Sequence, residues 1–299
     1  MFDAILKEFR ERKYLVTNSD LDGILCASLL CKYFPNLTLG GFTNSKDKIW
    51  VKNEVDKTNS VYLDIFVTTP ETLSIDNHII GFDSEEIYSD LKINPNIIRN
   101  RNLQNYTAKY PFSTFIFILK ILETKYNPLN IDIETIIGQT NNGENVYAWE
   151  ILLRADDTLS NTFLYSYNAD DWWRWILDGV NKDGLLFQLY NKLKKFVGNI
   201  DNAKYIKSKV QRFLYEKHQL SSDGFKDIVN PLFNCFVENI SKCLGYKLCF
   251  DFKTKLIRLE SKRSKIINKS KTKQELSNYN VKTLAFVQRD TISYSYYIK

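Results

Sequence analysis

The first hundred residues alternate short apolar runs with helix-length segments. Apolar runs with the composition of buried strands occupy 13–18, 37–42, 60–66, 77–83 and 96–100. The segment 23–34, GILCASLLCKYF, predicts a helix directly after the first of these strands. Strands that are apolar throughout and are separated by helices are typical of a parallel sheet covered on both faces. We therefore predict an α/β fold: a parallel sheet with helices on both faces.

The pattern becomes helical from about Pro111 and changes again after about Leu244. Helices are predicted at 111–126, 144–157 and 168–180, followed by basic amphipathic stretches. Four later segments alternate between apolar and polar residues or are rich in β-branched and aromatic residues. This pattern predicts strands at 246–252, 255–260, 283–288 and 291–298. The chain thus divides into an α/β domain (1–165), a helical connector (166–244) and a small mostly-β C-terminal domain (245–299).

Composition and charge narrow the class of protein. A chain of 299 residues with 44% hydrophobic and 25% charged residues is an ordinary globular protein of about two domains. The net charge of +6 is compatible with a polyanionic ligand without requiring one. Nine Lys and Arg residues and one acid lie between Lys253 and Lys273; they form either a solvated face or a surface that holds substrate phosphates.

Cysteine and histidine usage bears on metal class and compartment. The five cysteines form no CxxC pair and the chain has two histidines, which argues against a Cys/His zinc site. No segment resembles a signal peptide, and none reaches the ~18 apolar residues of a membrane span. We expect reduced, buried cysteines, a cytoplasmic protein and no membrane partner.

Four aspartates follow predicted strands. Asp20 and Asp22 lie in NSDLDG after the first strand, and Asp64 and Asp83 lie at the ends of the runs 60–66 and 77–83. The carboxyl ends of parallel strands open into one crevice, where oxygen ligands of this kind hold Mg²⁺ or Mn²⁺. Each aspartate also has a structural interpretation, as a helix N-cap or an Asx-turn.

The same segments resemble the motifs of the DHH superfamily of phosphoesterases. NSDLDGILCASLL is similar to the first motif, an Asp-x-Asp before a helix of small and apolar residues, and VYLDIFV to the second. HIIGFDSEE occupies the place of the third motif, Asp-His-His, and RADDTL resembles the fourth. The terminal FVQRDTISYSYYIK resembles the accessory substrate-binding domain, which would bring Arg289 to the substrate.

The resemblance implies a metal-dependent phosphodiesterase. Two Mn²⁺ or Mg²⁺ ions would activate the attacking water, and the substrate would be a nucleotide or a short single-stranded oligonucleotide. The implied metal ligands are Asp20, Asp22, Asp64, Asp83 and either Asp156 or Asp157.

The third motif departs from the family pattern. Asp83-Ser84-Glu85 stands where the family has Asp-His-His, so Glu85 is the candidate to replace a histidine ligand beside the catalytic Asp22 and Asp83. His78 is placed at the start of the same strand, about 16 Å from its end, and is predicted to be a core or edge histidine. Val16 stands where some branches of the family have a further histidine.

Other side chains leave alternatives open. Trp172, Trp173 and Trp175 either stack on bases or bury the joint between two parts of the chain. Arg99 and Arg101 either hold a substrate phosphate or lie in a surface loop.

Two rival functions remain. One is a DHH-like protein without catalysis that acts as a nucleotide sensor or as a scaffold. Its partner would be another protein or a second copy of the same chain. The other is a small-molecule phosphatase or pyrophosphatase.

Overall fold

A mixed sheet forms the centre of the molecule. The computed structural model describes residues 2–44, 47–126, 129–155, 158, 169–195, 200–220, 224–225, 228–250, 253–279 and 281–297. Within these residues the strands of a nine-stranded sheet follow the order β10-β11-β9-β3-β2-β1-β4-β5-β6. Their bounds are β1 Tyr14–Asn18, β2 Thr38–Thr43, β3 Lys48–Val51, β4 Ser60–Leu63, β5 Leu73–Ile75, β6 Lys92–Ile93, β9 Lys255–Lys265, β10 Val281–Gln288 and β11 Thr291–Tyr297.

The predicted α/β class is confirmed, and the sheet is parallel in one half only. Strands β2, β1, β4, β5 and β6 pair in parallel. From β3 onward the pairs are antiparallel, through β9 and β11 to β10. The expected parallel sheet is therefore a mixed one, because β3 and the C-terminal strands extend it beyond β2.

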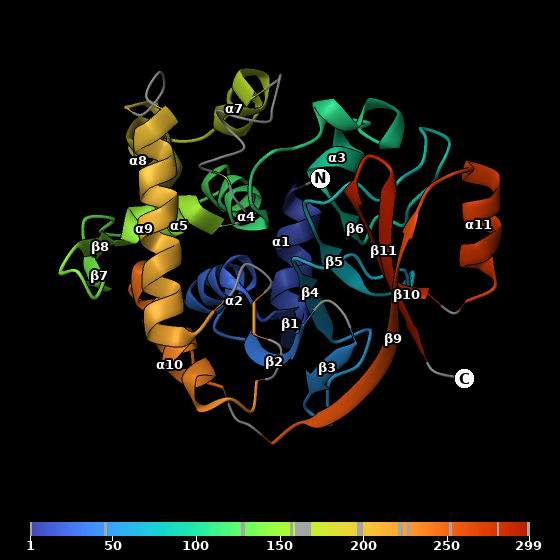
Figure 1. Cartoon of the computed structure of the whole chain (residues 1–299), viewed down its shortest axis with the longest axis horizontal. Helices are drawn as coiled ribbons and strands as arrows, with labels where there is room; N and C mark the ends of the chain where they lie inside the picture. Colours follow the sequence, from blue (N-terminus) through green and yellow to red (C-terminus); the bar gives the residue numbers. More distant parts are fainter. Residues whose placement is uncertain are drawn as a thin grey trace.

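In Figure 1 helices α2, α5, α8, α9 and α10 and a two-stranded ribbon (β7 Ile136–Gln139, β8 Asn145–Tyr147) lie to one side of the sheet, and α11 lies on the other side beside the C-terminal hairpin. The α-helices are α1 Phe2–Glu11, α2 Leu21–Tyr33, α3 Pro95–Ile98, α4 Thr114–Glu123, α5 Ala148–Arg154, α7 Ala169–Leu177, α8 Leu185–Lys194, α9 Ile200–His218, α10 Pro231–Ser241 and α11 Lys269–Ser277; the 3-10 helices are η1 Leu103–Ala108 and η3 Lys242–Leu244. None of these helices combines the length and the apolarity needed to cross a bilayer.

One hydrophobic core joins the helices to one face of the sheet. Leu15, Phe42 and Leu63 of the strands are buried together with Ile24 of α2 and Phe115 of α4. The helices of the predicted connector enter the same core through side chains that are also fully or almost fully buried: Trp172, Leu189, Val210 and Phe236.

The opposite face carries a separate, smaller cluster. Its buried members are Tyr14 and Val16 of β1, Val51 of β3 and Val55 of the following loop. Partly buried side chains from β3, β4 and β9 pack against them. Among the described residues no helix contributes to this cluster.

Three predicted strands and one predicted helix differ from the structure. Residues 77–83 form no strand; the strand is β5, and the apolar side chains that follow it pack on the C-terminal hairpin. Residues 96–98 belong to helix α3. The side chain of Asn94 caps this helix by accepting a hydrogen bond from Asn96 N, and Pro95 lies in the first turn. The predicted strand at 246–252 has no strand residue within 246–250, and the predicted helix at 144–157 divides into β8 and α5.

The C-terminal strands belong to the same sheet. Strand β9 pairs with β3 through Lys255–Arg258 and with β11 through Leu259–Lys265. Strand β10 bonds to the loops that follow β4 and β5: Leu284 N donates to Phe66 O at 3.3 Å, and Phe286 N donates to Ile79 O at 2.8 Å. The hairpin is therefore attached beside the ends of the parallel strands.

All five cysteines are unpaired. Cys26, Cys31 and Cys243 are buried as predicted, whereas Cys235 and Cys249 are exposed.

Candidate metal and phosphoester site

The loop after β1 places Asp20 and Asp22 at the start of α2. Asp20 is the N-cap, and its Oδ1 accepts from Gly23 N at 3.0 Å. A Cβ on Gly23 would lie 2.4 Å from Asn18 O, so only glycine allows the helix to start this close to the strand. The DxDG sequence thus forms a tight strand-to-helix turn with its first carboxylate at the edge of the sheet.

The Asp22 carboxylate is buried against the N-terminus of α4. It accepts from Thr114 N at 2.8 Å and from Phe115 N at 2.9 Å, where the positive end of the helix dipole favours an anion. Cys26 lies beside it, and burial, followed by the charges of Asp22 and Asp64, raises the pKa of the Cys26 thiol. Asp22 therefore holds α2 to α4, whatever else it binds.

Asp64 follows β4 in a backbone conformation that is uncommon for a residue with a side chain, φ 58°. Its Oδ2 accepts from Asn18 Nδ2 at 2.9 Å and its Oδ1 from Thr114 Oγ1 at 3.0 Å. Such strained positions persist where the surroundings hold them and are common at functional sites. The carboxylate is thereby oriented from two neighbouring elements.

Asp76 and His78 follow β5 and complete a cluster with Asp64. Ligand atoms of Asp64, Asp76 and His78 lie within 4.8 Å of one another. The Oδ1 of Asp76 is 2.8 Å from Nδ1 of His78, and Asp76 is 1% exposed. The prediction that His78 begins a strand far from the site is wrong: it lies just past the end of β5. The polar triplet Asp76-Asn77-His78 after an apolar run was the sequence signal that was missed.

Asp83 and Glu85 lie elsewhere. The Asp83 carboxylate forms ion pairs with Lys269 and Lys273 of α11 and accepts from Glu85 N. The Glu85 side chain is exposed. Neither belongs to the Asp64 cluster, because the chain leaves the edge of the sheet after His78 and runs toward the C-terminal hairpin.

The predicted phosphate-binding arginines have other surroundings. Arg99 bonds to Asp171 Oδ2 at 2.7 Å, and its guanidinium carbon lies 4.5 Å from the centre of the Trp172 ring. Arg101 is partly buried beside α3, and Arg289 is exposed in the turn between β10 and β11. The tryptophans of α7 thus join segments of the chain, as one interpretation expected. Asp156 and Asp157 lie outside the described residues.

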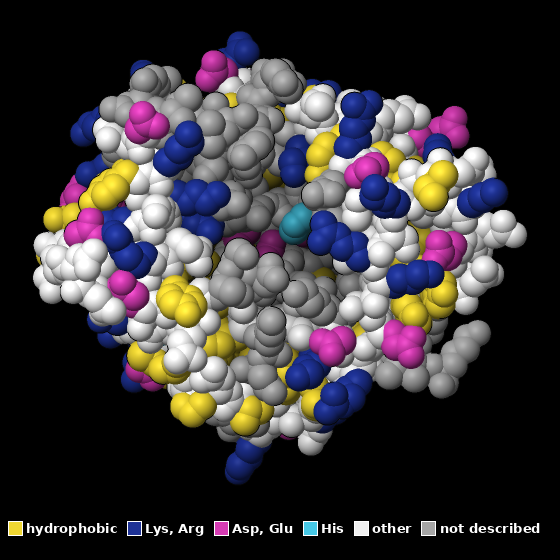
Figure 2. Space-filling model, viewed as in Figure 1, with side chains coloured by type: hydrophobic (Ala, Val, Ile, Leu, Met, Phe, Trp, Pro, Cys, Tyr) yellow, Lys and Arg dark blue, Asp and Glu magenta, His cyan; other side chains and the backbone are white. Residues whose placement is uncertain are grey.

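A cavity of about 390 Å³ separates the carboxylates from the C-terminal strands. Asp20, Asp64, Asp76 and His78 line one side, and Ser261 and Arg263 of β9 line the other. Figure 2 shows a hollow near the centre of this face, with acidic side chains at its floor, a histidine at its wall and Lys and Arg around its rim. His78 lines this cavity, whereas the other histidine, His218, is fully buried.

Arg263 is the cation that faces this cavity without a partner of its own. It is exposed, and among the described residues it makes no hydrogen bond or ion pair. Its neighbour Lys262 also lines the cavity but pairs with Glu275. Sequence reasoning missed Arg263 as an individual residue, because alternation along a strand shows its side only when the paired strands are known.

The chain matches no family model, no curated protein sequence and no solved structure.

Proposed function

We propose that this protein is a divalent-metal-dependent phosphoesterase that cleaves a phosphodiester in a nucleotide or a short single-stranded oligonucleotide. The observation that carries the proposal is the Asp64, Asp76 and His78 cluster, which faces Arg263 across one cavity. The cluster also supports the resemblance to the DHH superfamily. Asp76-Asn77-His78 keeps the Asp and the second His of the third motif, with Asn77 in place of the first His.

The three side chains suit a hard to borderline cation. Two carboxylates and one imidazole are ligands for Mn²⁺, and less so for softer ions that prefer thiolates. The Oδ1 of Asp76 lies 2.8 Å from Nδ1 of His78 and would hold the ring with Nε2 toward the ion, so Asp76 itself would bind the ion through its other oxygen. A divalent cation there would polarise a phosphoryl oxygen and lower the pKa of a bound water.

The opposite wall suits a phosphate. An arginine presents a planar fork of donors that matches phosphate oxygens, and Arg263 has no competing carboxylate within the described part of the chain. The hydroxyls of Ser261 and Ser293 line the same wall. The basic rim in Figure 2 favours a substrate with further phosphates over an isolated phosphomonoester.

The test pairs metal binding with turnover. Asp76→Asn and His78→Asn should each weaken Mn²⁺ binding in calorimetric titration by about 10- to 100-fold and abolish hydrolysis of a dinucleotide, a cyclic dinucleotide, short RNA or short DNA at millimolar Mn²⁺. Glu85→Gln is the control, because Glu85 is exposed and outside the cluster. Loss of binding in the control, or its retention in both cluster variants, would reject this ligand set.

Arg263 has its own test on the same strand. Arg263→Ala should raise KM for these substrates and leave the Mn²⁺ affinity unchanged. Arg258→Ala is the matched control, because Arg258 is exposed on β9 and does not line the cavity.

A second candidate is a nucleotide-binding protein without turnover. One observation favours it: both carboxylate oxygens of Asp22 accept backbone hydrogen bonds from α4. A two-ion site that needs Asp22 would compete with these bonds. Saturable binding of a nucleotide together with no cleavage of any substrate in the panel would establish this candidate instead.

A further inference from the structure

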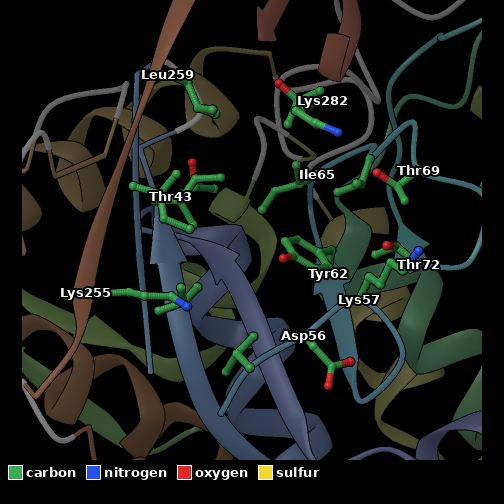
Figure 3. A pocket seen from close by; sticks show the side chains of 16 residues that line it. Thr43, Asp56, Lys57, Tyr62, Ile65, Thr69, Thr72, Lys255, Leu259 and Lys282 are labelled. Carbon is green, nitrogen blue, oxygen red and sulfur yellow. The ribbon is translucent and has the colours of Figure 1, made fainter. Parts of the chain in front are cut away.

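The face of the sheet that carries the smaller cluster of Val51 and Val55 contains a second cavity. It has a volume of about 410 Å³ and lies against β3 and β4, with β9 along one side. Figure 3 shows Tyr62 and Ile65 projecting toward the space from the β4 side and Lys255 from the β9 side, with Lys282 beside Ile65 and Thr69. Nothing in the proposed phosphoesterase chemistry uses this space.

Most of the surface that lines it is apolar. The apolar lining side chains come from β3, β4, β9 and the adjoining loops: Ile49, Val51, Val55, Ile65, Val67, Ile257 and Leu259. Ligand cavities in proteins have volumes of about 300–1,000 Å³, apolar walls and a few polar groups that orient the ligand. The volume and the lining of this cavity fall within that description.

The charged groups at the cavity are mainly cationic. Lys57, Lys255 and Lys282 line it together with one acid, Asp56. The Asp56 carboxylate is held by hydrogen bonds from the Thr58 backbone and hydroxyl. Lys57 pairs with Glu71, whereas Lys255 is exposed and makes no ion pair with a described residue.

We propose that this cavity binds a small amphipathic anion, with its apolar body against the aliphatic walls and its carboxylate or phosphate near Lys255 and Lys282. A helix of a partner protein fits less well. A partner helix needs an elongated hydrophobic groove, whereas β3, β4 and β9 bound this cavity on three sides. The hydrogen bond from Thr68 N to Lys282 O (2.9 Å) also closes the space on the side of β10.

The cavity adjoins the phosphoester site. Ile65 and Thr283 line both cavities, and Ile65 follows Asp64 directly. A ligand that packs on Ile65 therefore contacts the segment that holds the Asp64 backbone at positive φ. The binding inference stands independently of any hydrolysis.

The probe for the test is 8-anilinonaphthalene-1-sulfonate, an aromatic anion whose fluorescence rises in apolar surroundings. We expect saturable binding of one probe per chain to the native protein. Lys255→Glu should weaken it at least tenfold, because the substitution replaces an attractive charge with a repulsive one. Ile257→Phe, which fills part of the cavity, should weaken it as well.

Lys265→Glu is the matched control, because Lys265 is exposed on the same strand and does not line the cavity. Equal affinity in Lys255→Glu and Lys265→Glu, or no saturable binding at all, would overturn the proposal. Competition then separates two sources of the same chemistry. Displacement of the probe by decanoate identifies an aliphatic acid, displacement by a nucleoside monophosphate identifies a nucleotide, and displacement by neither overturns the ligand class.

Discussion

The imidazole ring of His218 is enclosed by apolar side chains. A substitution at this position measures how much its burial lowers the free energy of unfolding. The ring is fully buried at the end of α9, and both of its nitrogens lack a hydrogen-bond partner among the described residues. Phe213 and Phe236 surround it, with ring centres at 6.0 and 5.5 Å. Burial, with a smaller contribution from Lys217, lowers the pKa of His218 to about 4.

The pKa difference sets the pH dependence. The unfolded chain titrates this group near 6.5, so between pH 6.5 and 4 the unfolded state binds more protons than the folded state. The stability that depends on a neutral His218 is therefore fully present above pH 6.5 and is lost as the pH falls toward 4. A difference of about 2.5 pKa units corresponds to about 3 kcal/mol of unfolding free energy over that window.

His218→Phe should remove this dependence. At pH 7 the variant should be more stable by about 1 kcal/mol, since the unsatisfied ring nitrogens cost about 1–3 kcal/mol and the larger ring offsets part of the gain. Urea unfolding at pH 7.5, 6, 5 and 4 measures both proteins. The difference in unfolding free energy between the variant and the wild type should be constant above pH 6.5 and should widen by about 3 kcal/mol at pH 4. Parallel curves over the whole range would refute the reasoning.

Two further predictions concern residues around the site. Asp22→Ala should lower the unfolding free energy by about 2–3 kcal/mol in urea titration, because it leaves Thr114 N and Phe115 N unbonded in the core. A variant as stable as the wild type would mean that other groups cap the end of α4. Arg99→Ala should cost about 1 kcal/mol of stability through loss of the contacts with Asp171 and Trp172, with no change in KM; a raised KM at unchanged stability would restore the phosphate-binding role.

Local pattern was sufficient for the first half of the site. The strands β1 and β4 are apolar runs that end in Asn18 and Leu63, and the aspartates follow at once. Gly23 and the helix-forming sequence after it place Asp20 at an N-cap. These features depend on neighbours within a few residues, so the sequence alone predicts them and predicts that they meet at one edge of a sheet.

The second half depended on tertiary contacts. The run Ile79–Phe82 has the apolar character of a buried strand, but Ile79 and Phe82 are buried by Phe286 and Tyr294, about two hundred residues away. Strand β5, by contrast, has three residues and little pattern of its own. Hydrophobicity along a chain shows that a segment is buried and does not show which partner buries it. The carboxylate that joins Asp64 is therefore Asp76 and not Asp83.

The cation across the cavity was decided in the same way. The sequence determined that the C-terminal region is basic and extended, and composition alone cannot distinguish one arginine from the next in such a run. Pairing of β9 with β3 and β11 brings Arg263 to the wall of the cavity that Asp64 also lines, and it leaves Lys262 paired with Glu275. Side chains alternate along a strand with a period of two residues, so a register set by distant partners decides which charge faces the site.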